Sequence, residues 1–292
     1  MGLGVGLLVI LAAYNGEKWL VEQVESILHQ THVAPTIFIS LDLSDDDSLA
    51  LCEKLAKQYS NIQLLPYGER FGGAGKNFYR LIRDVDFFGF DYVALSDQDD
   101  IWLSNKLSHA VAMMKAHSAD VVSSDVLAFW EDGREKLVKK SYPQKSFDYF
   151  FEAAGPGCTY VFKVSVLQDF QAFLRQHWLQ VNQVDLHDWM LYAYCRSKGY
   201  QWHIDDKPLM RYRQHANNQV GFNSGFKAYK KRLQLVRSHW YQQEVTKIVA
   251  LVDPQGKSGF RLNRLFLIRH FWQLRRRPRD AWALLVMMIL NL

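Results

Sequence analysis

The chain has 292 residues, of which 49% are hydrophobic and 22% are charged, so it can form one large domain or two smaller ones. This composition lacks the bias of a disordered chain. The three cysteines, Cys52, Cys158 and Cys195, form neither a CxxC pair nor an even-numbered set, which argues against structural zinc and a disulfide scaffold. We therefore expect a reducing, cytoplasmic setting.

The net charge of +5 is divided unevenly along the chain. Residues 226–292 carry fourteen Lys or Arg against three Asp or Glu, a balance of +11, whereas the first 225 residues have a balance of −6. An acidic body followed by a basic tail suggests that the two parts meet different partners.

The first half of the chain alternates strand-like and helix-like segments. The apolar run 5–12 predicts a buried strand rather than a signal peptide, because no Lys or Arg precedes it and a helix-like sequence follows at once. Apolar residues at 20, 24, 27 and 28 lie on one face of that helix. Further strands are expected at 36–41, 62–65, 92–96 and 121–124, with helices at 49–59 and 77–84. This alternation predicts an α/β fold with a mostly parallel sheet.

After residue 143 the alternation is less regular. We expect a strand at 158–162, a helix at 184–196, a short strand at 202–204 and a helical, basic and aromatic pattern from 226. Residues 281–290 carry no charge, but ten residues are too few for a membrane span, which needs roughly 20. The expected organisation is a domain of residues 1–225, divided near 125, and a helical extension of residues 226–292.

An acidic cluster, Asp97-Gln98-Asp99-Asp100, follows the strand at 92–96. Three carboxylates in four residues repel one another, and hard cations such as Mg²⁺ or Mn²⁺ prefer oxygen ligands. In an open α/β sheet, ligands bind beyond the carboxyl ends of the strands, where this cluster falls. A solvated acidic turn is the alternative. The apolar strand before the cluster and Ile101-Trp102 after it favour a ligand site.

Four other polar segments are candidate binding elements. The acidic loop 42–47 also follows a strand and either caps a helix or contacts a nucleoside. The glycine-rich loop 68–77 precedes a helix whose free N–H groups suit phosphate, although it has neither a Walker nor a dinucleotide spacing. Asp188, in a His-Asp-Trp segment at a helix start, is either a helix-end charge or a general base. Residues 211–218 form either a polar surface loop or a lid over phosphate or metal.

Taken in order, these segments resemble family 2 of the inverting glycosyltransferases, whose fold is the GT-A nucleotide-binding sandwich. The resemblance covers about residues 8–221. It rests on AYNG at 13–16, SILHQT at 26–31, a loop at 39–48 similar to the family's DDGSTDGT, and Gly75 to Asn77. SDQDDIW at 96–102 with Lys106 resembles the DxD stretch of a rhamnosyltransferase subgroup, as do HDW at 187–189 and YRQHANN at 212–218.

Two positions depart from the family pattern. Leu41 stands where the family usually has the first Asp of its nucleotide-binding loop, and Asp47 replaces the usual Gly. The second Asp is present as Asp42. We therefore expect nucleotide binding to be retained, with an altered base preference.

The resemblance implies a single inverting transfer from a nucleoside-diphosphate sugar, such as dTDP-rhamnose or a UDP-sugar, to a hydroxyl of a saccharide or lipid-linked glycan. It places this reaction in bacterial cell-surface polysaccharide synthesis, with Mg²⁺ or Mn²⁺ as cofactor. Asp99 is the implied metal ligand, assisted by Asp97 and His215, and Asp188 is the implied base. The implied donor-side residues are Ala13, Tyr14, Asn15, Asp42, Lys76, Asp97 and Gln98. Residues up to about 125 would form the donor half, and residues 126–225 the acceptor half.

Two other classes of function remain open at this point. A sugar nucleotidyltransferase shares the fold type and metal, but it should carry a basic glycine-rich loop directly after the first strand. A non-catalytic protein that binds membranes or polyanions would explain only the basic tail. No nucleic acid partner is expected, because no recognised module accompanies the charge. The tail, with Trp272 and Trp282, either lies on the cytoplasmic face of a membrane or packs as helices on the domain.

Overall fold

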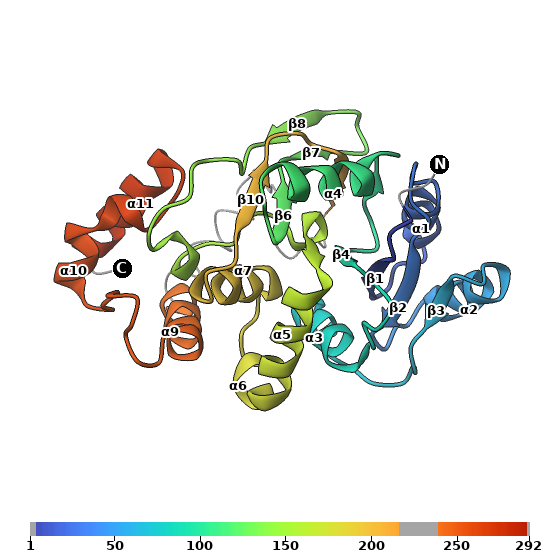
Figure 1. The fold of residues 1–292 in the computed structure, drawn as a ribbon, viewed down its shortest axis with the longest axis horizontal. Coiled ribbons are helices and arrows are strands. Elements are labelled where there is room, and N and C mark those ends of the chain that lie inside the picture. Colours follow the sequence, from blue (N-terminus) through green and yellow to red (C-terminus); the bar gives the residue numbers. More distant parts are fainter. Residues whose placement is uncertain (1–3, 216–238, 291–292) are drawn as a thin grey trace.

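The structure is a computed structural model that describes residues 4–215 and 239–290. Within these residues the chain forms a central sheet covered by helices, a smaller second sheet and a helical C-terminal part (Figure 1). The expected α/β fold with a mostly parallel sheet is therefore confirmed.

The central sheet has seven strands in the order β10-β6-β9-β4-β1-β2-β3, and every neighbouring pair is parallel except those made by β9. The parallel core brings the carboxyl ends of β1, β2 and β4 to the same edge. The bounds are β1 Leu7–Ala13, β2 Thr36–Leu41, β3 Ile62–Leu64, β4 Tyr92–Ser96, β6 Val121–Ser124, β9 Val161–Lys163 and β10 Trp202–Asp205.

Helices cover both faces of this sheet, which explains why β1 is apolar without interruption. Its even-numbered residues pack toward α3, α5 and α7, and its odd-numbered residues toward α1, α2 and α4. The bounds are α1 Leu20–Leu28, α2 Ser48–Gln58, α3 Ala74–Asp84, α4 Lys106–Ala116, α5 Val164–Gln176, α6 Trp178–Val181 and α7 His187–Ser197.

A second sheet of four short strands lies beside the first, in the order β5-β11-β7-β8. The bounds are β5 Ile101–Trp102, β7 Val126–Phe129, β8 Glu135–Val138 and β11 Met210–Arg213. The chain passes from β4 into β5 and from β6 into β7, so both sheets share the segments that follow β4 and β6. This sheet brings residues near 100 and near 213 together.

The C-terminal part is helical, as expected, from α9 onward. It comprises α9 Trp240–Val252, α10 Arg264–Arg269, a 3-10 turn η3 Phe271–Gln273 and α11 Pro278–Leu290. α9 packs on α7, while Phe260 stacks on Phe150 in the 3-10 turn η1 Asp148–Phe150. No helix among the described residues is both long and apolar enough to cross a bilayer. Residues 216–238, including the predicted boundary at 225, lie outside the described ranges, so the domain division stays a prediction.

Two expectations of secondary structure were wrong in detail. The segment expected to be a strand from Cys158 begins instead as a 3-10 turn, η2 Gly157–Thr159, and the strand starts at Val161. The helix expected from Val184 starts at His187. In both cases buried apolar residues extend beyond the regular element, because tertiary packing buries the turns as well.

Candidate functional site

The acidic turn lies at the carboxyl edge of the central sheet, between β4 and β5. The Gln98 side chain accepts a hydrogen bond from the Tyr14 N–H at 2.7 Å and donates one to the Tyr14 carbonyl at 2.7 Å. A Cβ on Gly16 would come within 2.3 Å of Gln98 Oε1, so a larger residue there would displace the Gln98 amide. Gln98 thus ties the acidic turn to the loop after β1, and Tyr14 remains 44% exposed.

Asp99 and His215 meet although 116 positions separate them in the chain. Asp99 Oδ2 lies 2.6 Å from His215 Nε2, and the imidazole stacks on Trp19 with ring centroids 4.4 Å apart. Arg213, at the end of β11, donates from Nε to the Asp99 carbonyl at 2.8 Å and from its backbone N–H to Asp100 Oδ1 at 3.1 Å. The pairing of β11 with β5 therefore builds this part of the site.

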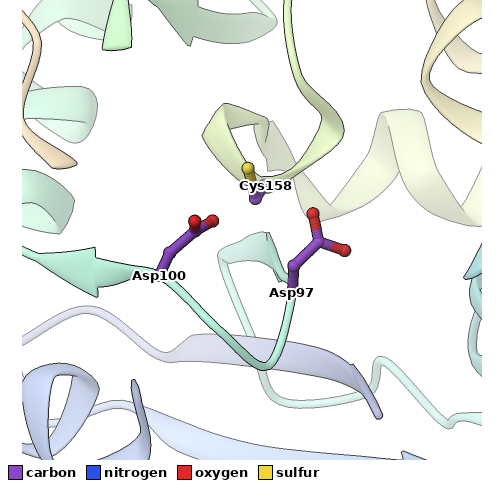
Figure 2. A group of neighbouring side chains, drawn as sticks. All are labelled: Asp97, Asp100 and Cys158. Atoms are coloured by element: carbon purple, nitrogen blue, oxygen red, sulfur yellow. The ribbon is translucent and has the colours of Figure 1, made fainter. Parts of the chain in front are cut away.

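The other two carboxylates of the turn form a cluster with Cys158, in which Asp100 and Cys158 are buried and Asp97 is partly buried. Ligand atoms of Asp97, Asp100 and Cys158 all lie within 4.8 Å of one another (Figure 2). Burial, reinforced by the neighbouring Asp99 charge, raises the pKa of Asp97 to about 7, and the same causes raise the pKa of Asp100 well above its usual range. The carboxyl groups of Asp97 and Asp100 therefore ionise less readily than exposed ones, and a nearby positive charge would stabilise their ionised forms.

Lys106 lies next to this cluster but does not neutralise it by a hydrogen bond. Its Nζ is buried over the Trp102 ring, 3.6 Å from the centroid, and it has no hydrogen-bond partner among the described residues. Burial lowers the pKa of Lys106 to about 7. Asp100 Oδ2 is also buried, and within the described part of the chain it likewise lacks a hydrogen-bond partner. An unpaired buried carboxylate oxygen is unfavourable, and a bound cation would satisfy it.

Asp188 lies in the first turn of α7, on the far side of η2 from this cluster. Its Oδ1 accepts the Trp189 N–H at 2.7 Å, and burial raises the pKa of Asp188 to about 6. A Cβ on Gly157 would lie 2.3 Å from His187 Nε2 and 3.3 Å from the Asp188 Cβ, so η2 packs directly against the start of α7. The charge of Asp188 also raises the pKa of Asp97, which places the two carboxyl groups within electrostatic range.

The carboxylate of Asp42, after β2, is engaged by the backbone of the glycine-rich loop. Oδ1 accepts the N–H of Leu43 at 2.8 Å and of Phe71 at 2.9 Å, and Oδ2 accepts the N–H of Gly72 at 3.0 Å. Asp42 is only 3% exposed. It therefore fixes the shape of the glycine-rich loop, and direct contact between its side chain and a nucleoside stays a prediction.

The loops after β1 and β2 are joined by side-chain hydrogen bonds. Asn15, with a positive φ of 45°, accepts the Asp45 N–H at 2.9 Å, and its own N–H donates to Ser44 Oγ at 3.0 Å. Asn77 Nδ2 donates to the Ala13 carbonyl at 3.2 Å from the first turn of α3, where Lys76 is partly buried. Ala13 thus ends β1, and Tyr14 and Asn15 follow it in the loop that Gln98 ties to the acidic turn. Contact of these residues with the donor stays a prediction.

A pocket adjoins His215 and carries both aromatic and charged side chains. Trp19 and Trp130 contribute the rings. Lys18 and Glu131 also line it and form an exposed ion pair at 2.5 Å. Aromatic faces beside acids and cations suit a polar ring with apolar C–H faces, which is the surface of a sugar.

Comparison with known proteins identifies the family. The model of glycosyl transferase family 2 matches residues 8–179. The chain is 48% identical over 289 residues to the dTDP-rhamnosyl transferase RfbG of Shigella flexneri, covering 97% of this chain and all of that protein. The chain belongs to glycosyl transferase family 2. It is a glycosyltransferase, and its expected membership of this family is confirmed.

More distant relatives agree with this assignment. Over 106 residues the chain is 29% identical to the UDP-Glc:alpha-D-GlcNAc-diphosphoundecaprenol beta-1,3-glucosyltransferase WfgD of Escherichia coli, covering 36% of this chain and 40% of that one. The structure of S. aureus TarS 1–349 in complex with UDP matches with a TM-score of 0.61 at 16% identity, covering 91% of this chain and 72% of that chain. At this identity the structural likeness supports the GT-A fold alone.

Sequence reasoning missed several residues that shape this site. Trp19 stacks on His215, and Arg213 ties β11 to the acidic turn. Cys158 belongs to the acidic cluster, and its neighbour Gly157 packs against the start of α7. Arg213 lies in the same polar segment as His215, which could have suggested it. Nothing in the sequence around Cys158 distinguishes it from an ordinary buried cysteine.

Proposed function

We propose that this chain transfers rhamnose from dTDP-rhamnose to a hydroxyl of a lipid-linked glycan, with inversion at the anomeric carbon. The donor is supported by 48% identity over nearly the whole chain to a dTDP-rhamnosyl transferase. The acceptor class is supported by WfgD, whose name specifies a sugar carried on diphosphoundecaprenol. The observation that carries the proposal is the contact of Asp99 with His215 beside Asp97, at the edge of the sheet where nucleotides bind.

The residues at this edge fit a hard divalent cation. Asp99 and His215 bring one carboxylate oxygen and one imidazole nitrogen to within 2.6 Å of each other. Asp97, two residues before Asp99 in the same turn, lies with Asp100 and Cys158, and its carboxylate would have to turn toward this pair to share a cation. Burial and mutual repulsion raise the pKa values of Asp97 and Asp100, and a bound cation would favour their ionised forms. Asp99, His215 and Asp97 would hold Mg²⁺ or Mn²⁺, which when bound supplies a Lewis acid for the departing diphosphate.

Asp188 would act as the general base for the acceptor hydroxyl. A base is most effective when its pKa is close to the working pH, and burial raises the pKa of Asp188 from 3.8 to about 6. The Trp189 N–H holds one carboxylate oxygen of Asp188, and the other oxygen would take the proton of the acceptor hydroxyl. General base catalysis of this kind contributes about 10²–10⁴-fold to the rate.

The donor side would be formed by the loops at the ends of β1 and β2 and at the start of α3. Tyr14 and Asn15 offer exposed groups next to Gln98, and Asp42 holds the glycine-rich loop that precedes α3. Lys76 lies in the first turn of α3, where a cation and free backbone N–H groups both favour phosphate. These contacts would orient the nucleotide while the acidic turn meets its diphosphate.

The acceptor class also supports a location for the reaction. A glycan carried on a polyprenyl diphosphate is confined to a bilayer, so the proposed transfer takes place at the cytoplasmic face of the membrane. The enzyme would approach this face from the side where nucleotide sugars are made.

The test is replacement of the proposed metal ligand, Asp99→Asn, with Asp206→Asn as a control at an exposed acid. The control should retain activity, whereas Asp99→Asn should lower turnover of dTDP-rhamnose at least 100-fold with little change in unfolding. Excess chelator should inactivate the wild-type enzyme, and Mn²⁺ or Mg²⁺ should restore it. Full activity in chelator would contradict the metal proposal but not the proposed transfer of sugar.

The reaction products separate this function from sugar nucleotidyl transfer. Transfer of rhamnose releases dTDP and lengthens the acceptor by one sugar. A nucleotidyltransferase would instead convert dTDP-rhamnose and pyrophosphate into dTTP and rhamnose 1-phosphate. Formation of dTTP without glycosylated acceptor would contradict the proposed function.

A further inference from the structure

Helix α11 presents one apolar face to the protein and another to solvent. Ala281 and Leu284 are buried, at 1% and 8% exposed. On the opposite side, Trp282, Val286 and Ile289 are 55%, 52% and 53% exposed, and their spacing places them on one stripe of the helix. Part of the apolar surface of this helix is therefore not covered by the described chain.

Neighbouring elements lie against this exposed stripe and carry further exposed apolar residues. Trp272 of η3 lies against Trp282, with ring centroids 6.1 Å apart, and Arg264 of α10 donates to the Ile289 carbonyl at 2.7 Å. We call this surface the α10–α11 face and define it by its exposed apolar residues, which are Leu262, Leu265, Trp272, Trp282, Val286, Ile289 and Leu290. Seven of the twelve exposed large apolar side chains among the described residues therefore gather in this C-terminal segment.

The charges in this part of the chain are almost entirely positive. Residues 254–290 contain eight Lys or Arg and one acid, Asp280, which pairs with Arg279 at 3.2 Å. Arg261, Arg264 and Arg269 are exposed in and just before α10. Figure 1 shows α10 and α11 at one end of the long axis of the molecule, with β3 and α2 at the other. The elements that carry the apolar residues thus also carry exposed cations, and they lie at one end of the molecule.

Two arginines of the tail belong to the interior instead. Arg276 is 4% exposed and donates from Nη1 to Asp148 Oδ2 at 3.1 Å, and Asp148 is fully buried. Arg275 donates to the Phe151 carbonyl. Arg275 and Arg276 therefore hold the tail on the protein and do not belong to its cationic surface. Leu284 is also buried against the protein.

We propose that the α10–α11 face docks on an anionic lipid bilayer. Its composition matches that surface, because tryptophan prefers the interface between headgroups and acyl chains and arginine binds lipid phosphates. An acidic protein partner would satisfy the arginines but not seven exposed apolar side chains. With 13 residues α11 is shorter than the roughly 20 that a span needs, so it lies in the plane of the interface. This inference goes beyond the proposed reaction, since docking requires neither donor nor acceptor.

Vesicle co-sedimentation of the full chain tests the proposal with phosphatidylcholine vesicles and with vesicles that also contain phosphatidylglycerol. The double variant Trp282→Ser/Ile289→Ser should bind anionic vesicles at least about tenfold more weakly than the wild type, at low and at high salt. The double variant Arg261→Gln/Arg279→Gln should bind roughly 20-fold more weakly at low salt, since each arginine contributes about fivefold. High salt should remove most of that difference, because it screens the charges.

Matched controls come from exposed apolar residues outside this face. Phe88 and Leu179 are 86% and 73% exposed, and the variant Phe88→Ser/Leu179→Ser should bind vesicles as the wild type does. All variants should keep wild-type turnover with a short water-soluble acceptor, which separates loss of docking from loss of catalysis. Equal vesicle binding by the wild type and Trp282→Ser/Ile289→Ser would overturn the proposal. A second result would also overturn it: the wild type forms a dimer in solution but does not bind vesicles, and Trp282→Ser/Ile289→Ser abolishes the dimer. The face would then bind a second copy of the chain.

Discussion

The variant Asp188→Asn should have lower turnover than the wild type and a higher free energy of unfolding. If Asp188 is the base, removing its charge lowers turnover at least 100-fold, while dTDP binds almost normally because the nucleotide side lies at the ends of β1 and β2. The same change removes a carboxylate whose ionised form is unfavourable in the folded protein, since burial raises its pKa from 3.8 to about 6.

The size and pH window of the stability gain follow from this shift. The folded protein holds the Asp188 proton more tightly than the unfolded chain does. The stabilisation of the folded state by this protonated carboxyl group is therefore fully present below about pH 4 and is lost as pH rises through about 6. A difference of about two pKa units corresponds to about 3 kcal/mol. Asparagine has no such titration, so the variant should gain up to about 3 kcal/mol over the wild type at about pH 8 and almost nothing at about pH 4.

Urea unfolding at both pH values measures this gain, and dTDP titration measures binding. Asp86→Asn is the matched control, because Asp86 is an exposed carboxylate that also accepts a backbone N–H, from Phe88 at 2.9 Å. The control should change neither stability nor turnover appreciably. A gain of the same size at both pH values would refute the electrostatic reasoning. A fall in dTDP affinity that matches the fall in turnover would place Asp188 on the donor side.

Two further predictions concern packing. Arg276→Ala should lower the free energy of unfolding by roughly 1.5–3 kcal/mol, because it removes a charged hydrogen bond from the fully buried carboxylate of Asp148, which Arg196 and Tyr192 still contact. The exposed control Arg279→Ala should change it by less than about 0.5 kcal/mol, and equal denaturation midpoints for the two variants would show that the tail is not fixed to the body. Gly157→Ala should cut turnover at least about tenfold with the fold retained, since its methyl would lie 2.3 Å from His187 Nε2 at the start of α7. At Gly155 the nearest atoms to an added Cβ are 3.5 Å away, so Gly155→Ala should be active, and equal activity of the two variants would contradict the packing argument.

The sequence determined the central sheet because burial on both faces leaves a clear pattern. β1 needs seven consecutive apolar residues to pack against helices on either side, and such a run can be recognised without the rest of the chain. The polar residues that follow β1, β2 and β4 could then be assigned to one edge, since parallel strands share the side on which they end. This rule places the loop after β1, which contains Asn15, beside the acidic turn after β4, which contains Asp97.

The second sheet could not be predicted in the same way. β5 has two residues and β11 has four, which is too short for a period to stand out. Yet the pairing of Arg211 with Ile101 brings His215 to Asp99 across 116 positions. Sequence reasoning could name both residues, but only long-range strand pairing decides that they touch.

The tail shows most clearly what the sequence determines and what the fold decides. Charge counting establishes that residues 226–292 are basic, because net charge does not depend on conformation. It cannot separate Arg276, which is buried against Asp148, from Arg261, which is exposed. Both have the same side chain, and the difference arises because η1 places a buried carboxylate beside only one of them. Burial and pairing are properties of the tertiary structure, so only the fold could divide these arginines between the protein interior and its surface.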